Sequence, residues 1–465
     1  MAQVSNRLTN NIKYYTLGVV STKLLSFIFV PLYSLYLLPE ALGTYQYIFS
    51  IISLCIPILY QDIWEGMFRF SILSKGHEID VINTTSKYFL NLSLLYVVLF
   101  GIAAYIFKLD YAGWILLTGL SNSAVSYWQF AARALQENKA YTLSTILCSV
   151  LVLLFNVVFI VILKWQIESL FISSIAGGIG AIAILEVRLH LISKAIHSTI
   201  DKPLLINIIK YSIPLAINVI SWWLTSSCNN IIVTKMLGPE ANGILSMALR
   251  FGSIFVLLTS IITMAWQEES FHSADDENKD AYFNKILNLY TKALFSSVIV
   301  LIPVTYICYK YLIFGEYKTG VALTSFMYIN GAFNAIICHL GSEFLTRGES
   351  KVMFWTTLVS GIVSVLIALL FVTPLGLIGV LCGTLTGYLV NLVVRVIMLN
   401  HRMNLQMNYI ELSILFAASV GVASLTHVFT DNIFALILIF VVGISFAFLY
   451  NKTLCMSLIQ KYIKK

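Results

Sequence analysis

Two cations lie inside long apolar segments, Lys23 in the first and Arg250 in the eighth. At 1.5 Å per helical residue, Lys23 would sit roughly 16 Å deep in a ~30 Å hydrocarbon layer, and Arg250 about 15 Å from the opposite face. A charge at this depth costs about 2.5–3.5 kcal/mol on insertion scales, so it is expected to face water or a partner. The two side chains are predicted to attract an anion such as a phosphate or carboxylate. The alternatives are a buried ion pair, or a Lys23 that extends to the membrane surface.

Aromatic and amide side chains gather in one further segment, between residues 222 and 230. Its members with a candidate role in substrate binding are Trp222, Trp223, Asn229 and Asn230. Aromatic faces beside amides are typical of a carbohydrate-binding surface. The structural alternative is that these polar groups join neighbouring helices.

Two carboxylates, Asp62 and Glu65, lie near the end of the second apolar segment, followed by Arg69. In one continuous helix, residues three and four apart are neighbours, so the three side chains would share a face. Asp62 or Glu65 is a candidate to couple transport to a proton or cation. The structural alternative is an Arg69–Glu65 pair at the membrane edge.

Apolar helices must position these residues, because the chain is 59% hydrophobic and 11% charged, against roughly 25% charged in soluble domains. The sequence predicts an all-α polytopic membrane protein, since the segments lack the alternation of a transmembrane β-barrel. About fourteen spans are expected. They are residues 12–38, 43–68, 84–107, 112–133, 141–163, 168–190, 207–236, 241–267, 283–309, 320–345, 352–373, 376–399, 408–428 and 432–450.

Short repeated words indicate that the chain is internally duplicated. Pro39-Glu40-Ala41-Leu42-Gly43 returns as Pro239-Glu240-Ala241-Asn242-Gly243, and Gln136-Glu137-Asn138-Lys139 resembles Gly348-Glu349-Ser350-Lys351. Paired halves of six spans each predict two pseudo-symmetric lobes in parallel orientation, as in transporters with a pathway between lobes. The predicted domains are an N-terminal lobe (1–200), a C-terminal lobe (201–403), and two further helices with a basic tail (404–465).

Most of the 29 lysines and arginines fall on one set of alternate loops. The positive-inside rule therefore predicts that both termini are cytoplasmic. The net charge of +7 follows from this bias, so no nucleic-acid partner is expected.

No constellation for catalysis stands out. The seven cysteines are scattered through apolar stretches, which predicts neither a disulfide framework nor a metal site. No nucleophile lies with a base and no phosphate-binding loop is present, so the chain is predicted not to be an enzyme and to need no cofactor. Gly379, Gly383 and Gly387 form a small-residue ridge at four-residue spacing, which predicts close helix packing.

The chain resembles the polysaccharide transporter family of bacterial lipid-linked oligosaccharide flippases, within the multidrug/oligosaccharidyl-lipid/polysaccharide exporter superfamily. The resemblance covers nearly the whole chain. Its motifs are Ser21-Thr22-Lys23, Leu38-Pro39-Glu40 with Gly43-Thr44-Tyr45, Leu237-Gly238-Pro239-Glu240 with Gly243, Arg69, Gln136-Glu137-Asn138-Lys139 and Gly348-Glu349-Ser350-Lys351.

The resemblance implies two six-helix lobes around a central cavity and alternating access in the bacterial inner membrane. The implied substrate is an undecaprenyl-pyrophosphate-linked oligosaccharide, such as an O-antigen unit, whose pyrophosphate would meet Lys23 and Arg250. Membrane lipid is a further expected partner, and contacts with a glycan polymerase and a chain-length regulator are also implied.

Three alternatives stay open. A multidrug or cation antiporter of the same superfamily tends to carry a carboxylate in its first helix, where this chain has Lys23. A peptidoglycan lipid II flippase tends to carry several cations there. A membrane-embedded glycan polymerase would be expected to have a large outer loop, and every outer loop predicted here is short.

Overall fold

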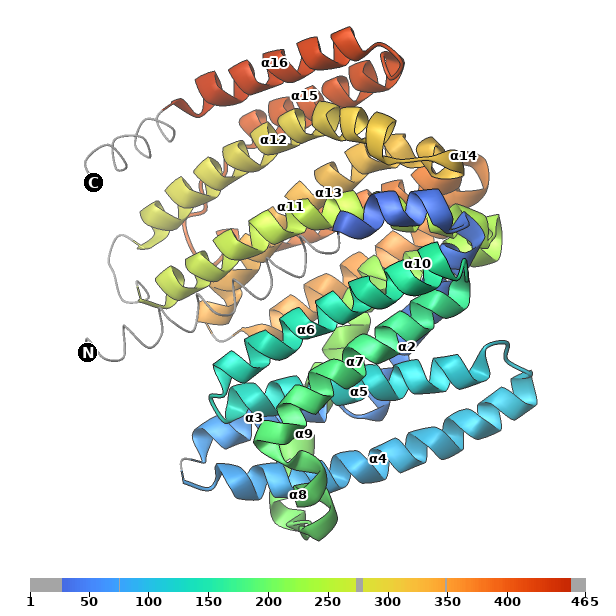
Figure 1. Ribbon diagram of the computed structural model, residues 1–465. Helices are drawn as coiled ribbons and strands as arrows, with labels where there is room; N and C mark the ends of the chain where they lie inside the picture. Colours follow the sequence, from blue (N-terminus) through green and yellow to red (C-terminus); the bar gives the residue numbers. More distant parts are fainter. Residues whose placement is uncertain (1–26, 75, 273–278, 348, 453–465) are drawn as a thin grey trace, which may run out of the picture. The chain divides into compact units, whose positions relative to one another are not determined.

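The computed structural model describes residues 27–74, 76–272, 279–347 and 349–452. These residues form helices and no strand, which confirms the predicted all-α class (Figure 1). Ten of the described helices are long and apolar enough to cross a membrane. The chain divides into two compact units, and the boundary falls between Trp223 and Leu224.

The first unit contains the helices up to the boundary at Trp223. They are Phe27–Tyr36, α2 (Pro39–Leu59), α3 (Ile63–Leu73), α4 (Glu78–Phe107), α5 (Ala112–Ala134), α6 (Asn138–Asn156) with the π-helical η1 (Val157–Ile162), α7 (Ile167–Leu189), α8 (Leu191–His197) and most of α9 (Lys202–Ser226). An aromatic core joins α4 and α5, where the rings of Phe89 and Tyr127 stack with centroids 4.5 Å apart. The fully buried Tyr127 hydroxyl lies 2.9 Å from Thr85 Oγ1 and 3.0 Å from Ser86 Oγ, so the polar end of this ring is satisfied.

The second unit begins at Leu224. Its helices are α10 (Cys228–Leu237), α11 (Pro239–His272), α12 (Lys279–Leu312), the 3-10 helix η2 (Gly315–Gly320), α13 (Val321–Thr346), α14 (Ser350–Asn400), α15 (Tyr409–Val428) and α16 (Ile433–Tyr450). Its core includes Phe295 and Phe333, whose rings meet edge to face with centroids 5.4 Å apart. From the second predicted span onward, every predicted span overlaps helical backbone.

The repeated words mark helix starts at matching points of the two units. Pro39 and Pro239 are the first residues of α2 and α11, and each is followed by a glutamate in the first turn. Proline lacks the N–H that a first helical residue leaves unpaired. An acidic side chain in the first turn stabilises the helix, because it interacts favourably with the helix dipole. Glu137 and Glu349 likewise directly precede α6 and α14. The words therefore recur because each starts a helix.

α14 contains the eleventh and twelfth predicted spans, which double back on each other at Gly376. This residue has φ 59° and ψ −138°, a conformation that glycine tolerates better than residues with a side chain. Past the bend, a Cβ on Gly383 would lie 2.7 Å from both Ala368 N and Ser364 O. The small-residue ridge is thus confirmed as a close contact between the two halves of α14.

The linker before α15 binds along one face of α12 through three side chains spaced one turn apart. Asn284 donates from Nδ2 to Asn404 O at 2.7 Å and accepts at Oδ1 from Gln406 N at 2.9 Å. Asn288 donates to Gln406 O at 2.7 Å and accepts from Asn408 N at 2.9 Å. We call this set, with the Asp280 carboxylate that accepts from Asn404 N at 3.3 Å, the asparagine ladder.

The ladder works because two repeat lengths nearly match. Four residues of helix rise about 6.0 Å, and two residues of extended chain span about 6.6 Å. The linker alternates as an extended chain does, with Met403, Leu405 and Met407 buried between exposed residues. The side chains of the ladder therefore bond the linker backbone, and the apolar side chains of the linker pack into the core.

Replacing Asn288 by Ala is expected to destabilise the protein by about 2 kcal/mol, because two hydrogen bonds to the linker backbone are lost. Thermal unfolding of the purified protein in detergent measures this. The matched control is Gln406→Ala, which removes an exposed side chain but leaves the paired backbone in place. Equal melting temperatures for the two variants would contradict the ladder.

Candidate functional site

Arg250 is the cation of the predicted substrate site that the structure describes. It lies in α11 and is half-buried, and its backbone oxygen accepts a hydrogen bond from Ser253 Oγ at 2.7 Å. Lys23 lies outside the described residues. The shared anion site therefore stays a prediction.

Asn229 and Asn230 lie side by side in sequence at the start of α10, and both are buried. Asn229 Nδ2 donates to Thr384 Oγ1 in the second half of α14 at 2.9 Å. An amide that bonds a facing helix is typical of helix packing in membranes. For Asn229, this contact agrees with the structural alternative, in which the polar groups of this segment join neighbouring helices.

Trp222 and Trp223 lie near the end of α9, at the boundary of the first unit. Trp223 donates from Nε1 to the backbone oxygen of Ser50 in α2 at 2.7 Å, so its indole is held within that unit. Trp222 is 36% exposed. Of the two indoles, Trp222 is therefore the more accessible to a ligand.

Asp62 and Glu65 lie at a break between α2 and α3. Gln61 and Asp62 have φ values of 55° and 49°, in the left-handed region, and the Asp62 N–H bonds to Pro57 O at 2.9 Å. This wide turn closes a helix end. The expected single helix over 43–68 is therefore wrong, and Asp62 precedes α3, 6% exposed, with Glu65 half-buried in the first turn.

The expected pairing of Arg69 with Glu65 is also wrong for the contacts that the structure describes. The Arg69 guanidinium lies over the Tyr211 ring, 4.2 Å from its centroid. Glu65 is instead attracted by Arg133 of α5, whose guanidinium lies 4.8 Å from the centre of the Phe68 ring. The break and these aromatic contacts direct each cation away from the simple helical pairing.

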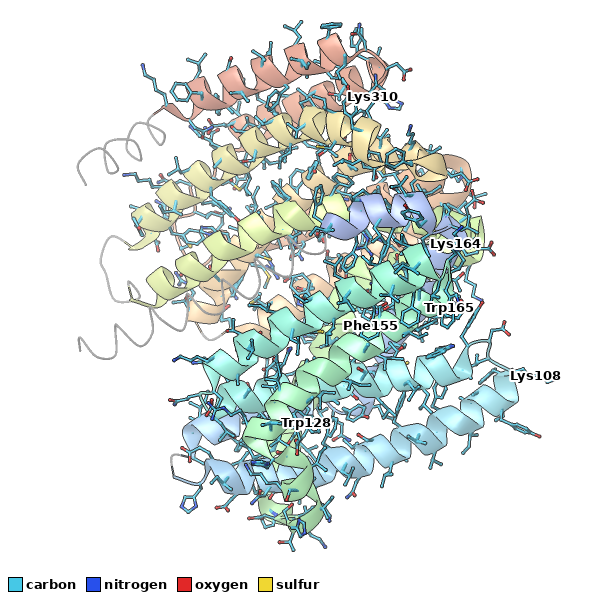
Figure 2. All side chains as sticks on the ribbon, viewed as in Figure 1. Lys108, Trp128, Phe155, Lys164, Trp165 and Lys310 are labelled. Carbon is cyan, nitrogen blue, oxygen red and sulfur yellow. The ribbon has the colours of Figure 1, made fainter. Side chains whose placement is uncertain are left out.

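Sequence reasoning missed Glu186, the carboxylate that ties α7 to α5 and α8. Its Oε2 accepts from Trp128 Nε1 at 2.9 Å and from Leu191 N at 3.0 Å, and its Oε1 accepts from Ile192 N at 3.0 Å (Trp128 is labelled in Figure 2). Burial lowers the pKa of Lys194 in α8, and attraction to Glu186 opposes this shift. The sequence signal that could have found it was a carboxylate in the last turn of the predicted span 168–190.

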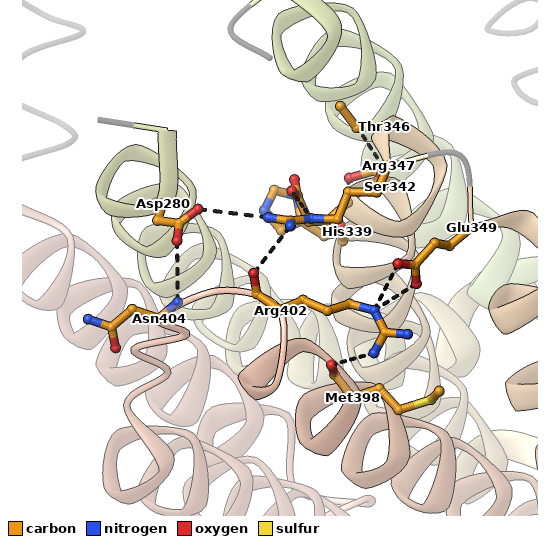
Figure 3. Close-up of polar contacts among 10 residues, drawn as sticks. Asp280, His339, Ser342, Thr346, Arg347, Glu349, Met398, Arg402 and Asn404 are labelled. Atoms are coloured by element: carbon orange, nitrogen blue, oxygen red, sulfur yellow. Dashed lines mark hydrogen bonds and ion pairs between the residues drawn. The ribbon is translucent and has the colours of Figure 1, made fainter. Parts of the chain in front are cut away.

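A charged network at one end of the second unit was also missed (Figure 3). Arg347 bonds Glu343 Oε1 through Nε at 2.9 Å and approaches Asp280 Oδ1 at 3.9 Å. Arg402 bonds Glu349 Oε2 at 2.7 Å. These pairs connect the start of α12, the end of α13, the residue before α14 and the residues after α14. The sequence signal was the four-residue spacing of Glu343 and Arg347, which puts them on one helix face.

Arg395, in the second half of α14, is fully buried. Its guanidinium donates to Thr356 Oγ1 at 3.1 Å, to Ile337 O at 2.6 Å and to Thr357 Oγ1 at 3.2 Å. All three of these partner groups are neutral: two threonine hydroxyls and one backbone carbonyl. The positive-inside rule alone would place this charge at the cytoplasmic membrane edge.

The fold matches solved structures of membrane transporters over most of the chain. A lipid II flippase MurJ in an inward closed conformation matches with a TM-score of 0.72 and 13% identity, over 96% of this chain and 100% of that one. An inward-facing multidrug resistance MATE family transporter of the MOP superfamily matches with a TM-score of 0.67 and 15% identity, over 86% and 95% of the two chains. At these identities the likeness shows the fold alone.

The family follows from the sequence itself. A profile of the family described as polysaccharide biosynthesis protein matches residues 8–267, more than half of the 465 residues. The chain belongs to this family, which confirms the resemblance drawn from its motifs. No protein in the search of curated sequences matches it.

Proposed function

We propose that this protein is a flippase that moves an undecaprenyl-pyrophosphate-linked oligosaccharide, a repeat unit of O-antigen or another surface polysaccharide, across the bacterial inner membrane. The family match over residues 8–267 is the observation that carries the proposal. The likeness to a lipid II flippase supports it, because that protein is named a flippase and shares the fold.

In this proposal, lobes 1–200 and 201–403 alternate around a cavity that opens to one leaflet at a time. Lys23 and Arg250 bind the pyrophosphate, since a guanidinium can form a fork with two phosphate oxygens. Trp222, Trp223, Asn229 and Asn230 line the path of the sugars. Both termini lie in the cytoplasm, where the biased lysines and arginines belong, and the glycan polymerase and chain-length regulator act on the product.

Depletion of this protein in its native cell tests the proposal. Lipid-linked glycan is expected to accumulate on the inner leaflet, and wild type but not Arg250→Ala or Lys23→Ala should relieve it at matched expression. The control is Arg188→Ala, which removes an exposed cation of α7. Rescue by both cavity variants would exclude the cationic site. Absence of accumulation, with altered resistance to cationic drugs, would replace the flippase by an antiporter.

Asp62 and Glu65 are the proposed ion-coupling groups. Burial of Asp62 at a helix break, beside a second carboxylate, supports this role, because buried ionisable groups in membrane helices often mark proton or ion paths. Transport into vesicles by Asp62→Asn should lose its dependence on a proton or sodium gradient. Wild-type transport that ignores both gradients would exclude the coupling role.

A further inference from the structure

A cavity of about 230 Å³ lies in the second unit, between residues 285–292 of α12 and the end of α16. Its lining residues are Lys285, Asn288, Leu289, Lys292, Tyr450 and Asn451. A site for one water needs only about 10–15 Å³ of such space, so the cavity has room for several waters. It therefore has room for a small polar group such as a phosphodiester with part of its substituent.

The two lysines give this cavity a net positive charge. Lys285 and Lys292 are seven residues apart, two turns along one face of α12. Lys292 Nζ lies 2.8 Å from Glu411 Oε1 and 5.5 Å from the centroid of the Tyr450 ring, so its head is fixed in place. Lys285 is exposed, and within the described part of the chain it forms no ion pair. One ammonium is thus left for an anion.

Asn451 adds a hydrogen-bond acceptor. It is 8% exposed, and its Nδ2 donates to Ser296 Oγ at 2.8 Å and to Ala447 O at 2.9 Å. These two bonds fix which end of the amide is which. Its Oδ1 is buried and has no hydrogen-bond partner among the described residues. A buried acceptor without a donor is costly, so it calls for a hydroxyl, an ammonium or a water.

The cavity lies where membrane spans end. α16 ends at Tyr450 and α15 begins at Tyr409, and both helices are apolar enough to cross a membrane. Just before the cavity, Phe448 and Leu449 of α16 are 50% and 69% exposed, as lipid-facing side chains would be. The asparagine ladder holds the chain between α12 and α15, so this end of the unit is braced. A cavity with lysine side chains beside a lipid-facing helix end is at headgroup level.

We propose that this cavity binds the headgroup of an anionic glycerophospholipid of the phosphatidylglycerol type. The phosphate accepts from Lys285, and a glycerol hydroxyl donates to Asn451 Oδ1. Basic pockets between membrane helices are known to take acidic lipid headgroups. The site is separate from the proposed pyrophosphate site, because its residues are other than Lys23 and Arg250, and it does not depend on what the protein transports.

Lipid binding to the purified full chain in a neutral detergent tests the proposal, with native mass spectrometry as the readout. Dioleoyl phosphatidylglycerol is expected to bind and dioleoyl phosphatidylcholine to bind far more weakly. Lys285→Gln should weaken phosphatidylglycerol binding roughly fivefold, since a lysine near an acidic lipid contributes about 1 kcal/mol. Lys285→Arg should keep the affinity. Lys351→Gln is the matched control, an exposed lysine of α14 in the same unit.

Two ligand comparisons separate the parts of the site. Phosphatidylmethanol carries the same single charge without a hydroxyl, so it should bind several-fold more weakly than phosphatidylglycerol if Asn451 accepts from the glycerol. Inorganic phosphate at equal concentration should not displace the lipid. Unchanged affinity in Lys285→Gln, equal binding of phosphatidylcholine or of phosphatidylmethanol, or displacement by inorganic phosphate would each overturn the proposal.

Discussion

Replacing Gly383 by Leu is expected to prevent a stably folded protein, with a loss of about 4 kcal/mol. A Cβ at this position would lie 2.7 Å from Ala368 N and Ser364 O and 2.8 Å from Ala368 Cβ. Two of these atoms belong to the backbone, so neither can move aside as a flexible side chain could, and overpacking of this kind is costly. Protein yield and the melting temperature in detergent measure the effect, and Gly383→Ala should be intermediate.

Gly421→Leu is the control for that substitution. Gly421 lies in α15, is exposed, and has no atom within 4 Å of a built Cβ. Its replacement should leave the melting temperature almost unchanged. A stable Gly383→Leu protein would show that the two halves of α14 can separate at this point without cost.

Arg395→Ala is expected to destabilise the protein by about 3 kcal/mol. The substitution removes three hydrogen bonds from a charged donor, each of which is stronger than a neutral bond, and leaves a cavity in a fully buried position. Arg395→Lys should be intermediate, because one ammonium cannot reproduce the planar fork that reaches α13 and the first half of α14 together.

Thermal unfolding in detergent measures these differences, and Lys351→Ala is the control. Lys351 is an exposed cation in the same helix, and changes at such positions usually stay within about 0.5 kcal/mol. A melting temperature of Arg395→Ala at or above that of wild type would mean that the desolvation of the buried charge exceeds what its hydrogen bonds return.

Helix positions followed closely from hydropathy. The sixth predicted span, 168–190, is α7 at Ile167–Leu189. Such agreement is expected, because the width of the hydrocarbon fixes how many apolar residues each span needs. The glycine ridge could also be predicted from the sequence, because a repeat at four residues puts the small residues on one face of a helix.

The breaks within helices could not be predicted from the sequence. Gln61 and Asp62 end α2 in a left-handed conformation although neither is glycine. Ser227 likewise separates α9 from α10 inside a predicted continuous span. None of these three residue types is a strong breaker of helices. The turn after Pro57 is stabilised by a backbone hydrogen bond that composition does not reveal.

Polar partners distant in sequence were the second gap. Arg395 meets Thr356 and Thr357 because the chain folds back at Gly376, and hydropathy alone places that arginine only near a membrane edge. Of the predicted substrate residues, Asn229 and Trp223 have partners in the neighbouring helices α14 and α2. A sequence shows that such groups are polar, but the partner depends on the direction in which each helix face points.

The asparagine ladder also restricts how this protein can change over time. Connections between helices usually accept insertions and deletions readily, because they lie on the surface and few contacts depend on their length. Here a single inserted residue between Met403 and Asn408 would exchange the buried and exposed sides of the linker and misalign its bonds to Asn284 and Asn288. Length variation among descendants of this gene should therefore avoid residues 403–408, while substitutions of Gln406 accumulate freely.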